Sequence, residues 1–231
     1  MNFSNLYYEY ATRITQESSV NVDFTHRCRL ECPFCMRQRP TGKPKIKRSK
    51  DMSISDFRKL IDSVQMIHLC GQLGDPIYNR NLHRCLEIKS TEYPKKRFGI
   101  HTNGSGKSMD WWKKTYELSD AKTYIQFGLD GLDQETLNTY RVNSNFDEVW
   151  NAMLLGKKMG VDVRWQFIVF GHNEHQLEDA KKLAKEHSIF FNLIKSSRWP
   201  VHNGHLIKKP SDKMWALGGS DNSYEVYHNR G

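Results

Sequence analysis

The sequence lacks the features of a membrane or secreted protein. It has no apolar run close to the length of a membrane span. Its first residues, Met1 to Arg13, are polar and aromatic, without the apolar core of a signal peptide. Three of its five cysteines fall within eight residues, which is unlike a disulfide framework. We therefore expect a cytoplasmic protein with reduced thiols and no membrane partner, in which such a tight cluster indicates metal.

The chain also lacks internal repeats and low-complexity linkers, and its 231 residues are enough for one sizeable core. Its formal net charge of +9 concerns partners more than fold. Basic proteins often bind nucleic acid, acidic peptides or anionic cofactors, but many are simply basic. The charge therefore leaves nucleic acid open as a partner without favouring it.

Strand-like and helix-like stretches alternate along the chain up to about residue 195. Helices are predicted from Ile54, near Leu82, from Met109, after Asp133, from Phe146 and around Leu177. The six predicted strands are Val20–Phe24, Met66–Cys70, Arg97–His101, Thr123–Leu129, Val163–Phe170 and Ile189–Ile194. This order predicts an α/β fold, a partial (β/α)6 barrel of parallel strands with helices outside. Residues 1–195 form the expected core domain, and residues 196–231 are a short tail without assignment.

Unusual residues follow five of the predicted strands. They are Cys28, the Gly71–Pro76 stretch, Thr102–Gly104, Asp130–Gly131 and Gly171–Asn173. In parallel α/β folds, functional residues gather at the carboxyl ends of the strands. We therefore expect these residues to meet in one site.

The cysteines have the spacing C-x3-C-x2-C, formed by Cys28, Cys32 and Cys35. Three thiolates this close can hold one iron–sulfur cluster and leave one iron open for a ligand. The alternative is zinc with His26 or another fourth ligand, although structural zinc sites usually pair two C-x2-C units and no second one is present. Of the other two cysteines, Cys85 is expected in the core and Cys70 near the site.

The cysteine motif, with aromatic Phe34 before its last thiol, resembles the signature of the radical S-adenosylmethionine (radical SAM) superfamily. The resemblance extends from Val20 to Lys195 and departs at Arg29, where many members have Asn. It implies a [4Fe-4S] cluster on Cys28, Cys32 and Cys35, with Phe34 close to the adenine of bound S-adenosylmethionine.

Further segments are similar to this family in the same order. Gly71 to Pro76 resembles the glycine-rich turn whose backbone receives the methionine amino group, with Asp75 where members commonly have Glu. The segments at Asp130 and at Asn173 resemble those of peptide-modifying and molybdopterin-type members. The cofactor-binding residues implied by this resemblance are Phe34, Gly71, Gly74, Asp75, Asn103, Asp130 and Asn173.

The resemblance implies the reaction but not the substrate. One electron, from a donor such as flavodoxin or ferredoxin, would cleave S-adenosylmethionine to methionine and a 5′-deoxyadenosyl radical, which abstracts hydrogen from a substrate. No acid–base residue is needed for this step, so no catalytic residue is expected beyond the cluster ligands. No cysteine follows Cys85, unlike the cysteine-rich C-terminal extension of many peptide-modifying members. The substrate stays open between a peptide, a nucleotide and another acidic molecule.

Two other functions compete with this interpretation. One is an activase that installs a glycyl radical in a partner protein, and the other is a zinc-containing nucleic-acid-binding module. A basic loop, residues 37–50, holds seven Lys or Arg and no acid: Arg37, Arg39, Lys43, Lys45, Lys47, Arg48 and Lys50. It is either a solvated surface or a means of attracting an acidic substrate, phosphate-bearing or peptide.

Overall fold

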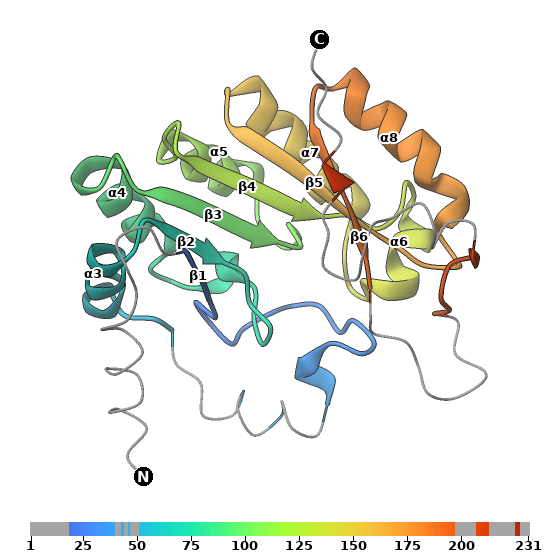
Figure 1. Cartoon of the computed structure of the whole chain (residues 1–231), viewed down its shortest axis with the longest axis horizontal. Coiled ribbons are helices and arrows are strands. Elements are labelled where there is room, and N and C mark those ends of the chain that lie inside the picture. Colours follow the sequence, from blue (N-terminus) through green and yellow to red (C-terminus); the bar gives the residue numbers. More distant parts are fainter. Residues whose placement is uncertain are drawn as a thin grey trace.

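The computed structural model of the chain describes residues 19–39, 43, 46, 51–196, 207–212 and 225–226. Figure 1 shows one twisted sheet with helices packed along one of its faces. The segment that follows the first strand, which carries the clustered cysteines, runs along the other side. None of the helices within the described ranges is long and apolar enough to cross a membrane.

The sheet has seven strands, arranged in the order in which they occur along the chain. The first six are parallel: β1 (Ser19–Val22), β2 (Met66–Leu69), β3 (Arg97–Thr102), β4 (Thr123–Gly128), β5 (Asp162–Val169) and β6 (Phe190–Lys195). They confirm the predicted α/β fold, with strand ends within two residues of those predicted. The seventh, β7 (Glu225–Val226), pairs antiparallel with β6 and lies in the stretch that the sequence left without assignment.

Within the described ranges, six α-helices connect these strands. They are α3 (Ile54–Ser63), α4 (Leu82–Glu92), α5 (Met109–Glu117), α6 (Gln134–Tyr140), α7 (Phe146–Lys158) and α8 (Leu177–Glu186). Each of α3, α5, α6 and α7 begins after a side chain that accepts a hydrogen bond from the backbone three residues later: Ser53, Ser108, Asp133 and Asn145. Such caps satisfy backbone donors that the first helical turn leaves without partners.

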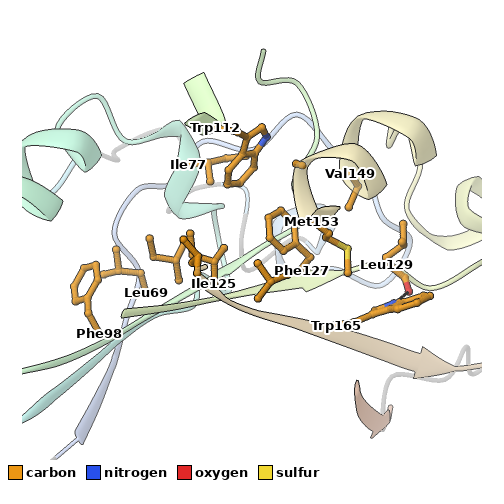
Figure 2. Packing of buried hydrophobic residues seen from close by; sticks show 14 of the residues in the cluster. Leu69, Ile77, Phe98, Trp112, Ile125, Phe127, Leu129, Val149, Met153 and Trp165 are labelled. Carbon is orange, nitrogen blue, oxygen red and sulfur yellow. Dashed lines mark hydrogen bonds between the residues drawn. The ribbon is translucent and has the colours of Figure 1, made fainter. Parts of the chain in front are cut away.

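The main hydrophobic core lies between the sheet and the helices (Figure 2). Ile125, Phe127 and Trp165 from β4 and β5 meet Trp112 of α5 and Met153 of α7, and all five side chains are fully buried. The Trp112 and Phe127 rings lie 5.0 Å apart between centroids. This packing fixes the strands and therefore the positions of the loops at their carboxyl ends.

The other face of the sheet is polar. Successive side chains of a strand point to opposite faces, so His101, Gln126 and Gln166 alternate with the apolar core residues of β3, β4 and β5. Strands of a parallel sheet that is covered on both faces are usually apolar throughout. Here the second face borders a cavity instead.

Candidate active site

A cavity of about 710 Å³ lies at the carboxyl ends of the parallel strands. Seven of the ten predicted site residues line it: Cys28, Cys32, Cys35, Gly71, Gly74, Asp75 and Asn103. The other three, Phe34, Asp130 and Asn173, are not part of its lining. The structure thus brings together the cysteine loop (residues 23–35), the glycine turn (residues 71–76) and the end of β3.

The cysteine loop is held by hydrogen bonds around its thiols. The backbone N–H of Leu30 and the side-chain amide of Asn103 donate to Cys28 Sγ, at 3.4 and 3.5 Å. A tight turn joins Cys35 N to Cys32 O at 3.2 Å, and Phe34 within it has a φ of +63°. N–H donors on a cysteine sulfur stabilise its thiolate and tune the potential of a cluster bound there.

All three clustered cysteines are free of disulfides. Burial raises the pKa of Cys28 to about 12 and that of Cys32 to about 11. Both are therefore protonated thiols at neutral pH before metal binds, and binding must release their protons. The three cysteine thiols can thus serve as ligands of a metal cofactor whose binding displaces their protons.

The three clustered thiols can be compared with the site that a single metal ion requires. Within the part of the chain that the structure describes, no three His, Cys, Asp or Glu side chains converge closely enough to hold one metal ion. A zinc ion needs its ligands to meet at one point. An iron–sulfur cubane binds its cysteine ligands on separate irons, so it does not require the three thiols to meet at one point.

The glycine turn depends on the absence of side chains. A Cβ at Gly74 would overlap the carbonyl group of Thr25, and one at Gly71 would overlap the carbonyl group of Gly74. The backbone of this turn therefore forms part of the cavity wall that any side chain at these positions would disrupt.

Asp75 ends the glycine turn and is 5% exposed. Its carboxylate accepts hydrogen bonds from Thr102 Oγ1 at 2.8 Å, from the backbone of Asn103 at 2.6 Å and from the Asn103 side-chain amide. Burial raises the pKa of Asp75, although these donors favour its ionised form. Through Asn103, Asp75 links the glycine turn to Cys28.

Arg141 is a cavity residue that the sequence analysis missed. It directly follows α6, lines the cavity, and its Nε donates to Asp130 Oδ2 at 2.7 Å. Burial alone would lower the pKa of Arg141, but the Asp130 carboxylate overcomes this and raises it. Gly128 makes room for the guanidinium, because a Cβ there would overlap it. A permanent positive charge thus faces the cavity.

Asp130 and Asn173 support this wall from behind. Asp130 is fully buried, and besides binding Arg141 it accepts from the backbone of Ile168 at 2.7 Å. Asn173 accepts from Phe170 N at 2.7 Å and donates to the carbonyls of Asp130 and Ile168, both at 2.9 Å. Their polar groups are engaged within the protein, at the ends of β4 and β5.

Phe34 has apolar surroundings beside the cavity. It packs with Tyr140, Phe170 and Ile207, and Tyr140 itself lines the cavity. Ile207 belongs to the tail, where Lys208 O accepts from Gly171 N at 2.9 Å. The described part of the tail thus closes one side of this cluster.

The polar face of the sheet contributes His101, Gln126 and Gln166 to the cavity wall. Gln126 Nε2 contacts His101 Nδ1 at 3.2 Å and Gln166 Oε1 at 2.9 Å. His101 Nε2 contacts Tyr124 OH at 2.7 Å, and a Cβ at Gly99 would overlap the Tyr124 ring. Side chains alternate between the two faces of a strand, so the apolar core positions of β3, β4 and β5 could have placed these three polar residues on the opposite face.

The two remaining cysteines lie as expected from the sequence. Cys85 is fully buried in the core on α4, and Cys70 follows β2 and lines the cavity. Burial raises the pKa of Cys70 to about 11, so it is a neutral thiol at physiological pH.

Comparison with known proteins identifies the family. A family model described as "Radical SAM superfamily" matches residues 22–184, which include the cysteine loop, the glycine turn and β2 to β5. The chain belongs to the radical SAM superfamily. A search of curated protein sequences found no match. The family model and the similar solved structures give no support to the glycyl-radical activase or to the zinc-containing module.

Solved radical SAM structures have the same fold at low identity. Streptococcus suis SuiB bound to S-adenosylmethionine is 15% identical with a TM-score of 0.65, and the match covers 89% of this chain and 46% of SuiB. Native anSMEcpe with bound AdoMet is 18% identical with a TM-score of 0.60, covering 81% and 55%. Methylornithine synthase (PylB) is 14% identical with a TM-score of 0.59, covering 85% and 59%. The chain therefore spans about half the length of these relatives.

Proposed function

We propose that this chain cleaves S-adenosylmethionine reductively and uses the resulting radical to abstract hydrogen from a peptide. The observation that carries this proposal is that Cys28, Cys32 and Cys35 line one cavity with the glycine turn and the Arg141 guanidinium. When bound, the [4Fe-4S] cluster and S-adenosylmethionine supply the electron-transfer and radical chemistry, which the protein directs by positioning.

Each residue of the site has a role in this proposal. Cys28, Cys32 and Cys35 hold the cluster, and Asn103 donates to the sulfur of Cys28. Gly71 and Gly74 allow the close backbone packing that shapes the glycine turn, and Asp75 fixes the end of that turn. We assign the backbone of this turn to the methionine amino group. The contacts of these residues and the family membership of the chain support these roles.

The charged methionine end of the cofactor also needs a partner for its carboxylate. We assign this role to Arg141, because its planar guanidinium suits a carboxylate and its charge is secured by Asp130. Asp130 and Asn173 then act as positioning residues, which hold Arg141 and the end of β5, and Phe34 borders the adenine.

A peptide substrate is supported by two observations. The related SuiB has been solved bound to precursor peptide SuiA, and anSMEcpe has been solved with bound AdoMet and Cp18Cys peptide. In addition, the cavity wall of His101, Gln126 and Gln166 offers both donors and acceptors, as an amide group requires.

The basic loop bears on how such a substrate is attracted. Arg37, Arg39 and Lys43 belong to the described residues, whereas Lys45, Lys47, Arg48 and Lys50 lie outside them. Attraction of an acidic peptide by this loop stays a prediction, and so do the cytoplasmic location and the electron donor, flavodoxin or ferredoxin.

The proposal is tested on iron-reconstituted protein under anaerobic conditions. The wild type should bind about four irons per chain and form 5′-deoxyadenosine from S-adenosylmethionine after reduction with dithionite. Replacing Cys28, Cys32 and Cys35 together by Ala should remove both properties, and the matched control Cys85→Ala should keep them. Iron retained at wild-type levels by the triple variant, or no deoxyadenosine from the wild type, contradicts the proposal.

A further inference from the structure

A second pocket, here called the outer pocket, borders the cysteine loop. It has a volume of about 380 Å³. Its lining residues are His26, Arg27, Cys28, Arg29, Arg37, Ile46 and Tyr78. Only Cys28 and Arg37 are shared with the large cavity. A molecule in the outer pocket can therefore approach Cys28 without entering the site where S-adenosylmethionine is proposed to bind.

The outer pocket is strongly basic. Three of its seven lining residues are arginines, and Lys107 lies next to it, with its Nζ 4.9 Å from the centroids of the Tyr78 and Trp111 rings. Among the described residues, the acidic side chain that pairs with these cations is Asp51, in an ion pair with Arg27. A second carboxylate, Glu148, accepts a hydrogen bond from Gly106 N at 2.8 Å, beside Arg29. The four cations (Arg27, Arg29, Arg37 and Lys107) still outnumber these two carboxylates, so the rim carries an excess of positive charge.

These cations differ in how firmly the protein already holds them. Arg37 donates to the carbonyls of His26 and Leu73 and so joins the cysteine loop to the glycine turn. Arg29, in contrast, is exposed and has no ion pair with any described residue. Arg29 is therefore the charge at this rim that is most available to a partner. Lys107 lies over the Tyr78 and Trp111 rings but, like Arg29, forms no ion pair with a described residue.

We infer that the outer pocket is the docking surface for an acidic electron-transfer protein, which delivers its electron through Cys28. The inference rests on the proposed function, because that reaction consumes one electron per cleavage. An electron donor needs to come near a cluster ligand, and it does not need to reach the cofactor inside the cavity. A substrate must enter the cavity itself, so a basic surface outside it suits the donor better.

Electrostatics give this surface a clear kinetic role. Complementary charge raises the rate of encounter by about 10- to 1000-fold at low salt and adds less to the lifetime of the complex. Electron-transfer complexes are characteristically small and transient. Exposed charges also lose their effect beyond roughly 10 Å at 0.1 M salt, so docking should weaken steeply as salt is added.

The test compares two reductants on the iron-reconstituted protein. The variant Arg29→Glu/Lys107→Glu reverses two charges at the outer pocket. The matched control Lys59→Glu/Lys182→Glu makes the same change in net charge at exposed positions on α3 and α8. Deoxyadenosine formation is measured with dithionite and, separately, with increasing amounts of a reduced bacterial flavodoxin. Binding of dye-labelled oxidised flavodoxin is followed by fluorescence anisotropy at about 20 and about 200 mM NaCl.

We expect kcat/KM for flavodoxin to fall about tenfold in the outer-pocket variant, with a matching loss of flavodoxin binding and of its salt dependence. The dithionite reaction and the control variant should match the wild type. Unchanged flavodoxin kinetics and binding overturn the inference. An equal loss in the dithionite reaction also overturns it, since these residues would then serve the cavity or an acidic substrate. If wild-type protein forms no deoxyadenosine with dithionite, the proposed function fails instead, and the binding measurement still decides the docking.

Discussion

The two faces of β4 are buried to a similar degree but differ in chemistry. Ile125 and Phe127 on the helix side are fully buried among apolar side chains, whereas Tyr124 and Gln126 on the cavity side are 6% and 5% exposed. The first pair is stabilised by removal from water, and the second needs hydrogen bonds to offset the cost of burial. Stability alone would favour an apolar second face, so its polar character indicates that it serves the cavity.

The strongest test of this difference removes the charge that the cavity face holds. Replacing Arg141 by Met leaves the carboxylate of Asp130 buried without its counter-charge. Breaking a buried ion pair on one side typically costs about 3–5 kcal/mol. We expect a loss of this size in the free energy of unfolding, measured by urea denaturation, together with loss of S-adenosylmethionine binding measured by calorimetry.

The double variant Arg141→Met/Asp130→Asn separates the two effects. Without either charge the buried wall is neutral, so stability should recover most of the loss. Binding of S-adenosylmethionine should not recover, because the guanidinium is still absent. If binding returned with stability, Arg141 would be a structural residue only, and its proposed contact with the cofactor carboxylate would be wrong.

A second test uses two neighbours on opposite faces of β4. Ile125→Ala opens a cavity in the core and should cost about 2–5 kcal/mol of unfolding free energy. Gln126→Ala should cost about 1 kcal/mol, since its hydrogen bonds to His101 and Gln166 are lost but the site borders open space. Turnover of a peptide substrate per folded molecule should fall for Gln126→Ala alone. Equal turnover in both variants would remove the functional distinction between the faces.

Much of this molecule follows from local sequence patterns. The alternation of strands and helices predicts the parallel order, because each helical crossover returns the chain to the same direction. Cys28, the glycine turn and Asn103 lie in the loops that follow β1, β2 and β3, so the carboxyl edge where they meet is also predictable. The predicted helix cap at Asp133 is also confirmed, because its side chain accepts a hydrogen bond from the backbone of Thr136, only three residues later. A contact this local can be predicted from the sequence.

Contacts between distant segments are where local patterns fail. Arg141 extends from the end of α6 to Asp130 and the cavity, and its guanidinium fits only because Gly128 has no side chain. No spacing of residues in the sequence predicts this contact. Cofactor binding by Asp130 and Asn173 stays a prediction, and the hydrogen bonds that engage their polar groups within the wall are contacts that local patterns do not encode. The pairing of β7 with β6 joins residues more than thirty positions apart through a two-residue strand, too short for a periodic signal.

The last effect we predict is a pH dependence of stability, and it comes from the chain of hydrogen bonds behind the cavity wall. Tyr124 OH lies 2.7 Å from both His68 Nδ1 and His101 Nε2, and Gln126 Nε2 lies 3.2 Å from His101 Nδ1. An amide NH2 is a donor, so His101 accepts at Nδ1 and carries its hydrogen on Nε2. This arrangement needs neutral imidazole. Burial also favours the neutral imidazole, because burial lowers the pKa of His101 to about 4.

The pKa of His101 makes stability depend on pH in a defined direction. In the unfolded chain the imidazole takes up a proton near its ordinary pKa of 6.5, whereas in the folded protein it stays neutral down to about 4. The unfolded state therefore binds more protons in this interval, and stability falls as the pH drops through it. Between about pH 7.5 and about pH 5 the share of His101 should be about 2 kcal/mol. Urea denaturation of His101→Gln should show a shallower pH dependence than the wild type by this amount, and parallel profiles would show that His101 is not held neutral.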